Sequence, residues 1–150
     1  MLTAPVEPLI VISTFGPRPR PNGPLHLGID LACKLGQDVR AVATGVVLKS
    51  YLSSCDPPTW RPGDPKPRVM GYGNVVFISH DDGTQARYAH LDARTVREGD
   101  RVDAGQVIGR AGTTGYSFGV HLHFELRRDG KPIDPLPFFA HLNPAVISRS

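Results

Sequence analysis

"GVHLHFELR", residues 119–127, alternates between apolar and polar side chains at every position after its glycine. Successive side chains of a β-strand point to opposite faces, so this alternation predicts a strand with one buried face. Its apolar residues would face a core, while His121, His123 and Glu125 would share the other face. An HxH pair on a strand is a common fragment of metal sites. Taken alone, the pair is equally well explained by a polar outer face.

"PLHLGIDLA", residues 24–32, shows the same alternation. Three aliphatic residues occupy one parity, and His26, Gly28 and Asp30 occupy the other. Histidine and aspartate are ordinary zinc ligands, and a glycine between them would leave space for an ion. The upstream prolines and the internal glycine argue against a helix. By itself this segment is also explained by an exposed histidine and aspartate on an edge strand.

Glycine and proline dominate the composition, with 16 and 15 residues among 150. A chain of this length fits one domain with a core, and its turn-forming residues favour many short strands over long helices. "DDG" at 81–83 is typical of a hairpin turn. We therefore predict a mainly β protein, a single antiparallel β-sheet domain with long loops and little helix. Strands are expected at 25–32, 38–50, 74–80, 84–91 and 120–128.

One connection is unusually long. Residues 51–73 hold five prolines between two predicted strands, and such long loops tend to be functional or disordered. Cys55 lies in this segment. Together with Cys33 it does not form a CxxC pair, which excludes a zinc ribbon. The sequence leaves open whether the two cysteines form a disulfide or stay reduced.

Charge and hydropathy exclude some function classes. The net charge is +3, and the basic residues are too scattered to indicate nucleic-acid binding, although an anionic polymer such as a cell wall fits. No segment approaches the roughly 20 apolar residues of a membrane span. "LIVI" at 9–12 is too short for a signal peptide and lacks a preceding basic region. A secreted protein would therefore need another route, such as release encoded by a phage, or would have lost its signal.

A third histidine, His90, lies near the end of a predicted strand in "RYAHLDA", residues 87–93. Alone it is explained as a surface histidine beside a turn. Strand parity places Tyr88 on the same face as His90, either lining a groove or packing. His80 is expected to be structural and His141 incidental.

The three segments "HLGID", "YAHL" and "GVHLHFE" occur in this order, each on a predicted short strand. Together they strongly resemble the M23 family of zinc metallopeptidases, the lysostaphin-like or LytM-type peptidoglycan endopeptidases. The resemblance runs over residues 15–139 and includes "FGPR", "GYGNVVFISH", "EGDRVDAGQVIGRAGTTG" and "DPLPF". It implies a half-barrel groove and a peptidase domain at 15–139 with an insertion at 51–73. Residues 1–14 would be a lead-in and residues 140–150 a tail.

The resemblance also implies roles for individual residues. His26, Asp30 and His123 match the zinc ligands, with one Zn²⁺ per chain. Three protein ligands leave a fourth position open, as catalytic zinc requires. His90 and His121 match the catalytic histidines. His121 fits a general base because it shares a strand face with His123, and His90 fits a donor to the transition state, although the reverse assignment fits equally well. Glu125 is expected either to support a ligand or to be purely structural.

The implied function is a zinc endopeptidase that hydrolyses peptide cross-links of bacterial peptidoglycan, acting at the cell wall in the periplasm or outside the cell. A phage-type endolysin is one form of it. An inactive cell-wall binding or regulatory domain is an alternative, and so is a zinc amidohydrolase acting on another peptide. A biotinyl or lipoyl carrier is disfavoured because no lysine lies in a suitable hairpin. The bond that is cut and the oligomeric state are not readable.

Two departures from the family pattern concern the groove. Phe118 and Val120 stand where relatives often have a small polar residue and a proline, which predicts a more apolar groove. The stretch "RPRPNGP", residues 18–24, lacks a tyrosine that some relatives place before the first zinc histidine. Any stabilisation of the transition state that such a tyrosine gives would have to come from another part of this chain.

Overall fold

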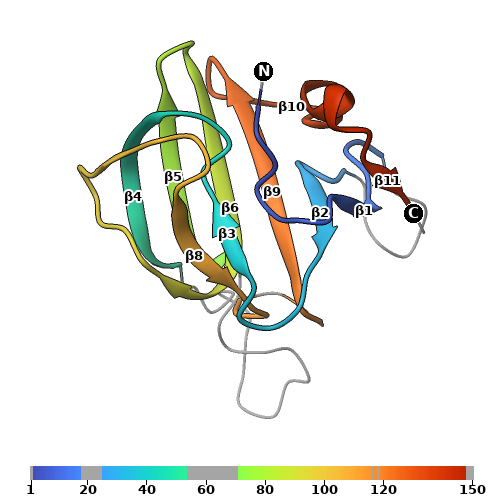
Figure 1. Cartoon of the computed structure of the whole chain (residues 1–150), viewed down its shortest axis with the longest axis horizontal. Coiled ribbons are helices and arrows are strands. Elements are labelled where there is room, and N and C mark those ends of the chain that lie inside the picture. Colours follow the sequence, from blue (N-terminus) through green and yellow to red (C-terminus); the bar gives the residue numbers. More distant parts are fainter. Residues whose placement is uncertain (1, 18–24, 54–70, 116, 118, 148–150) are drawn as a thin grey trace.

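The computed structural model describes residues 2–17, 25–53, 71–115, 117 and 119–147. Eleven strands within these residues belong to one sheet, in which the main path runs β11-β1-β2-β9-β6-β5-β4-β7 (Figure 1). All strand pairs are antiparallel except β1 with β11. The predicted mainly β class is therefore confirmed, with one parallel pair at the edge. The strands are β1 (Ile10–Ser13), β2 (Ile29–Ala32), β3 (Asp38–Arg40), β4 (Gly45–Ser53), β5 (Gly73–His80), β6 (Thr84–Arg94), β7 (Arg101–Val102), β8 (Val107–Ala111), β9 (His121–Arg128), β10 (Lys131–Ile133) and β11 (Ala145–Val146).

Strand β9 occupies the middle of the sheet, between β2 and β6. Its apolar residues Leu122, Phe124 and Leu126 are fully buried in the main core, as their alternation predicts. The opposite face of β9 carries the two histidines and Glu125. In β2 the same division places Ile29 and Leu31 in the core.

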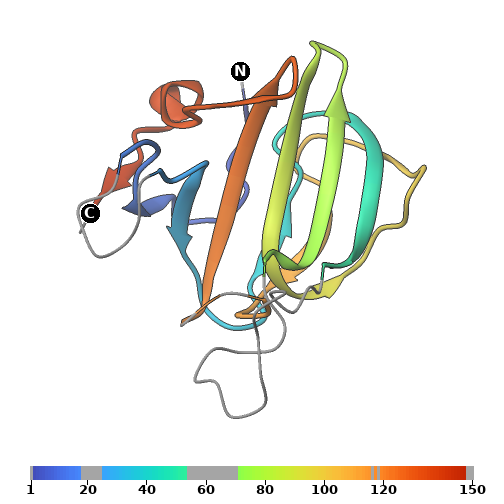
Figure 2. The same ribbon diagram turned by 180° about the vertical axis from the view of Figure 1, so that it is seen from behind.

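The core lies between the main sheet and a second layer made by β3, β8 and the N-terminal segment. Figure 1 shows these segments in front of the sheet, and Figure 2 shows the opposite, more open face. Val6, Val39 and Ile108 come from the second layer and are buried in the same cluster as the apolar residues of β9. The polar side chains of β2, β6 and β9 therefore face away from the core, onto the open face of the sheet.

Two sequence expectations need correction or extension. The strand predicted at 38–50 is wrong as one element, because it divides into β3, which pairs with β8, and β4, which pairs with β5. Residues 41–44 pass between these two layers. The segments expected to be a lead-in and a tail also contribute strands, since β1 and β11 extend the sheet beyond β2. The domain boundaries placed at residues 14 and 139 stay predictions.

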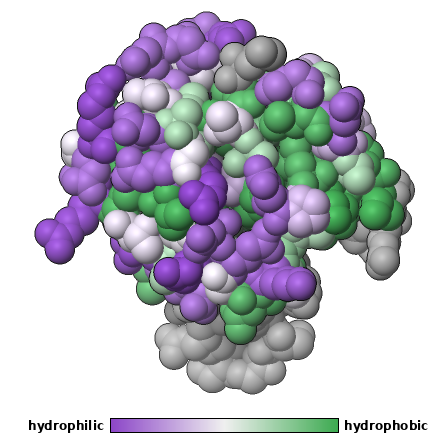
Figure 3. Space-filling view, viewed as in Figure 1, coloured by the Kyte–Doolittle hydropathy of each residue, from purple (hydrophilic) through white to green (hydrophobic). Residues whose placement is uncertain are grey.

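The C-terminal part adds a 3-10 helix at Leu136–Leu142, which buries Phe139 against Phe124 of β9. Three hydrophobic residues near this helix are exposed, namely Leu142, Val146 and Ile147. Figure 3 shows hydrophobic residues gathered on the right of the view. Hydrophilic residues dominate the left of the same view. No helix in the described part of the chain has the length and apolar character needed to cross a membrane.

Candidate metal centre and active site

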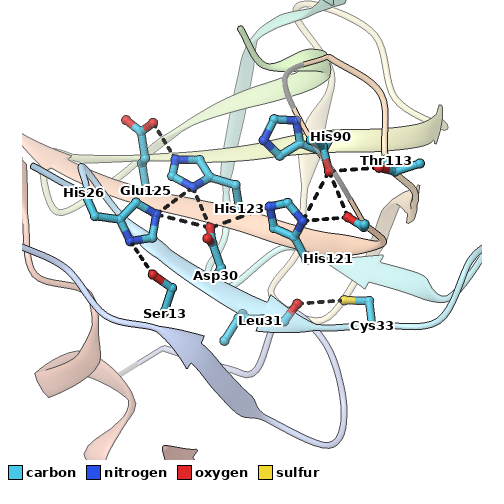
Figure 4. Close-up of polar contacts among 12 residues, drawn as sticks. Ser13, His26, Asp30, Leu31, Cys33, His90, Thr113, His121, His123 and Glu125 are labelled. Carbon is cyan, nitrogen blue, oxygen red and sulfur yellow. Dashed lines mark hydrogen bonds and ion pairs between the residues drawn. The ribbon is translucent and has the colours of Figure 1, made fainter. Parts of the chain in front are cut away.

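His26, Asp30 and His123 direct one donor atom each to the same point on the open face (Figure 4). Asp30 Oδ1 lies 2.8 Å from His123 Nδ1 and 3.2 Å from His26 Nε2. The two histidine nitrogens are 3.2 Å apart. The structure therefore brings together the three residues that sequence reasoning selected as metal ligands.

Strand pairing explains this convergence. Asp30 of β2 lies directly opposite His123 of β9. His26 precedes β2 and is held by a backbone bridge to Gly16. Gly28 lies between the two ligands, where a Cβ would overlap the carbonyl oxygen of Phe124 and approach Cγ of Glu125 to 2.9 Å. The glycine thus makes room for β9 and the Glu125 side chain, rather than for an ion as the sequence suggested.

The donor set fits a zinc ion. Zinc is bound tetrahedrally by histidine nitrogen and carboxylate oxygen at about 2.0–2.2 Å, which places neighbouring donors roughly 3.4 Å apart. The three separations of 2.8–3.2 Å approach that value, so small outward movements would admit the ion. Two imidazoles and one carboxylate also leave a fourth position for water or substrate, as in catalytic sites.

Each metal-site histidine is anchored through its other ring nitrogen. His26 Nδ1 lies 2.9 Å from the carbonyl oxygen of Thr14, and His123 Nε2 lies 2.9 Å from Glu125 Oε2. An N–H at each of these positions donates to its oxygen and leaves the other ring nitrogen as the one that can bind a metal. Ligating histidines almost always have such partners, which fix the ring orientation and the tautomer. The contact is the one that the ligand-supporting alternative for Glu125 requires, and the choice between that role and a purely structural one stays a prediction.

Glu125 is 1% exposed, and both of its carboxylate oxygens accept hydrogen bonds. Its Oε2 also accepts from the Tyr72 hydroxyl at 2.6 Å, while Oε1 accepts from Arg127 Nη2 at 2.7 Å and Nε at 3.1 Å. Burial alone would raise the pKa of Glu125, but the hydrogen bonds and charge of His123, with those of Tyr72 and Arg127, outweigh burial and hold this pKa at about 2. The side chain is therefore a carboxylate at neutral pH.

Burial and hydrogen bonding also oppose each other in setting the pKa values of the candidate ligands Asp30 and His123. Burial would raise the pKa of Asp30, but hydrogen bonds and charges from His123 and His26 hold it well below its usual value. Burial would lower the pKa of His123, yet its hydrogen bonds to Asp30 and Glu125 raise it to about 9. Protons and a metal ion consequently compete for the same nitrogen of His123.

His90 and His121 line the same pocket, with ring centroids 4.9 Å apart. His121 Nε2 lies 3.7 Å from Asp30 Oδ1, and the His90 ring centroid is 5.9 Å from that of His123. His90 has a φ of 63° and lies at a register shift between β5 and β6. Such a bulge re-aims a side chain, and here it turns His90 to the open face.

Both of these histidines are held through Nδ1 by a backbone carbonyl oxygen. His90 Nδ1 lies 2.7 Å from the carbonyl oxygen of Thr114, and His121 Nδ1 lies 2.8 Å from that of Gly119. With a proton on Nδ1, each ring donates to its carbonyl and leaves Nε2 unprotonated. Burial and the neighbouring His121 lower the pKa of His90 to about 4, so its imidazole is neutral at pH 7.

The pocket around these residues has a volume of about 400 Å³. Tyr72, which sequence reasoning missed, forms part of its lining and stacks on His123 at 6.2 Å between ring centroids. The residue falls within the segment interpreted as an insertion, although it also belongs to the "GYGNVVFISH" stretch that contributes to the family resemblance. Its place before a strand that neighbours "YAHL" was the available signal.

Other predicted residues have mixed outcomes. The prediction that Tyr88 shares a face with His90 is wrong, because the bulge at His90 breaks the alternation of side chains. Tyr88 is fully buried against Phe124, and its hydroxyl oxygen accepts a hydrogen bond from the Val42 N–H. His80 is buried outside the pocket, and His141 lies in the 3-10 helix. Most of the long loop, with Cys55, and also Phe118 lie outside the described residues. The Cys33–Cys55 pairing and the apolar groove therefore stay predictions.

The model of peptidase family M23 matches residues 24–135, which span the whole candidate site. The chain belongs to this family. The resemblance seen in the sequence is thus confirmed, and the match includes all five histidine and aspartate residues of the site.

Curated relatives carry two kinds of description. The DD-carboxypeptidase/endopeptidase Mpg of Neisseria meningitidis is 41% identical over 137 residues, covering 87% of this chain and 28% of that protein. The murein hydrolase activator NlpD of Escherichia coli is 38% identical over 128 residues, covering 85% of this chain and 28% of that protein. The chain thus spans little more than a quarter of the length of either relative.

Solved structures confirm a lysostaphin-like fold. The catalytic domain of the antimicrobial peptidase lysostaphin from Staphylococcus simulans superposes with a TM-score of 0.71 at 31% identity, covering 88% of this chain and 92% of that chain. A zinc-containing peptidase from Vibrio cholerae gives a TM-score of 0.70 at 31% identity, covering 87% of this chain and 37% of that chain.

Proposed function

We propose that this chain is a zinc-dependent endopeptidase that hydrolyses peptide cross-links of bacterial peptidoglycan at the cell envelope. The observation that carries the proposal is the convergence of His26, Asp30 and His123 beside two further histidines in one pocket. The family match and the relatives described as peptidases support it.

Zn²⁺ at the three donors would supply a Lewis acid that polarises the scissile carbonyl and lets water react at neutral pH. The side chains of the pocket would then move the protons. A neutral histidine removes a proton from the attacking water through Nε2 and returns it to the leaving amine as the C–N bond breaks. His121 is the proposed base, because its Nε2 lies close to the donor cluster, 3.7 Å from Asp30 Oδ1.

His90 is the proposed second catalytic residue. Its ring lies beside that of His121 and is fixed by Thr114. To donate a hydrogen bond to the negative oxygen that develops on the attacked carbonyl, His90 takes up a proton from solvent at Nε2, because the developing negative charge beside the ring raises its pKa. The two histidines can exchange these roles in the same geometry, since each ring is held through Nδ1 by a backbone carbonyl oxygen, which leaves Nε2 available.

The test is digestion of two purified peptidoglycans, one glycine-bridged and one directly cross-linked, followed by mass spectrometry of the fragments. We expect the zinc-loaded chain to cleave peptide bonds in one or both, and His121→Ala and His90→Ala each to lose 10²-fold or more of the rate. His141→Ala, a histidine outside the pocket, is the matched control. Failure to cleave either wall with one zinc bound per chain would refute the endopeptidase.

The similarity to NlpD favours one second candidate, a domain that binds peptidoglycan and activates other hydrolases. The presence of three convergent metal donors argues against it, since binding alone needs no open metal position. Wall binding without zinc uptake and without cleavage would establish this alternative.

A further inference from the structure

Two arginines lie beyond the active-site pocket on the same face of the sheet. Arg127 follows Glu125 by two residues on β9 and shares its face, and Arg87 of β6 lies directly opposite Glu125. A second pocket of about 250 Å³ opens beside both arginines, next to the turns at Gly83 and Gly130. The metal donors and the two guanidinium groups therefore lie along one face of neighbouring strands.

Both guanidinium groups are held in place by their neighbours. Arg87 Nε donates to Gln85 Oε1 at 2.7 Å and Nη1 to the Tyr72 hydroxyl at 3.3 Å. Its Cζ also lies 4.1 Å from the centroid of the Phe77 ring, a cation–π geometry. Arg127 uses Nε and Nη2 on Glu125. Each guanidinium has five N–H donors, so both retain donors in a fixed orientation.

The two positive charges of Arg87 and Arg127 are only partly balanced by ion pairs. Arg127 pairs with Glu125, but Arg87 has no carboxylate within ion-pair distance in the part of the chain that the structure describes. Asp129 also lines the second pocket, where it is exposed, and it forms an ion pair with neither arginine among the described residues. Two fixed guanidinium groups beside an open pocket match the planar, bidentate geometry of a carboxylate.

We propose that Arg87 and Arg127 form a subsite for a free carboxylate of the substrate peptide. The inference rests on the proposed function and names its substrate class. His123 and Arg127 are four strand residues apart, roughly 13 Å, and the Arg127 side chain turns back towards Glu125. An extended peptide advances about 3.3–3.6 Å per residue, so the carboxylate lies two to four residues from the scissile bond. A stem peptide with free carboxylates meets this requirement, whereas a glycine bridge offers only neutral groups.

The test compares one cross-linked stem-peptide dimer in two forms, with its carboxylates free or converted to primary amides. We expect the zinc-loaded chain to cleave the free form with a kcat/KM at least about ten-fold higher, as a charge-assisted hydrogen-bond pair implies. In Arg87→Gln and in Arg127→Gln the ratio of the two kcat/KM values should fall towards one. Arg40→Gln, a partly exposed arginine of β3, should keep the parent ratio.

The ratio of the two kcat/KM values shows whether the arginines recognise the substrate carboxylate or only hold the neighbouring side chains in place. If the arginines only position Glu125 and Tyr72, their variants lose rate on both peptides by the same factor, and the unchanged ratio overturns the inference. Calorimetric titration of both peptides into His121→Ala gives a readout independent of turnover, with tighter binding of the free form expected. Equal cleavage of both forms by the parent refutes the subsite but not the endopeptidase. If the zinc-loaded parent binds the free form more tightly but cleaves neither form, the endopeptidase is refuted and the subsite is supported.

Discussion

Asp30 and His123 are direct cross-strand partners in the β2–β9 pair, with Asp30 Oδ1 2.8 Å from His123 Nδ1. Because side chains alternate along a strand, a slip of one residue in this register would turn one of the two into the core. The buried aliphatic residues of both strands oppose such a slip. The packing of the core therefore sets the geometry of the candidate metal centre.

The first prediction concerns metal binding by Asp30. We expect one zinc per chain by elemental analysis, and a loss of binding in Asp30→Asn because the carboxylate supplies one of three donors. Zinc at 100 times its Kd should stabilise the parent by about 2.7 kcal/mol and raise Tm by roughly 5–10 °C. Asp38→Asn, which removes an exposed ion pair with Arg110, is the control and should keep both effects. Equal zinc affinity in Asp30→Asn would contradict the assignment.

The second prediction concerns Gly28. A Cβ there would overlap the Phe124 carbonyl oxygen, so Gly28→Ala should push β2 away from β9 and destabilise the fold by about 1–3 kcal/mol. Thermal unfolding should show Tm lowered by roughly 2–10 °C, with weaker zinc binding as the ligands separate. Gly119→Ala is the matched control, because a Cβ at Gly119 meets nothing within 4 Å. An unchanged Tm in Gly28→Ala would show that the strands can relax around the methyl group.

The sequence predicted the parts of the site that depend on local alternation. In β9 and in β2 the period of two residues separates core from pocket, and it places His121, His123 and Asp30 correctly on the open face. The same rule fails at His90, where a positive φ breaks the alternation and sends Tyr88 to the core instead. A bulge of this kind depends on the neighbouring strand, so the chain's own pattern does not reveal it.

Contacts between segments far apart in the chain also could not be predicted from the sequence. The Tyr72 hydroxyl reaches Glu125 across 53 residues, and Arg87 meets Glu125 only through the β6–β9 register. The division of 38–50 into two strands likewise depends on which partner strands each half finds. In each case the deciding interaction is tertiary, and local propensity is a weak guide to it.

The third prediction concerns the Cys33 thiol. Burial raises the pKa of Cys33 to about 11, against about 8.5 for an ordinary thiol. Since the thiolate is the reactive form, alkylation by iodoacetamide at pH 8 should be slower by roughly two orders of magnitude than for a free thiol, and should accelerate about ten-fold per pH unit up to pH 10. Peptide mass spectrometry would follow the modification at Cys33 alone. A thiol that stays inert at every pH until a phosphine reductant is added would instead show the disulfide.

The last prediction concerns the support that Glu125 gives to His123. In Glu125→Gln one side of the amide can accept, but its NH₂ group must face either Arg127 or the His123–Tyr72 side, where the neighbours are donors. We expect zinc affinity, measured by chelator competition, to fall about 10- to 100-fold, as for other changes behind a ligating histidine. Tyr72→Phe removes one hydrogen bond to the same carboxylate without adding an opposed donor, so its loss should be smaller. Glu98→Gln, at an exposed glutamate outside the pocket, should bind zinc as the parent does. Zinc affinity unchanged in Glu125→Gln would mean that the His123 ring is held by β9 and Asp30 alone, and that the buried carboxylate serves only to neutralise Arg127.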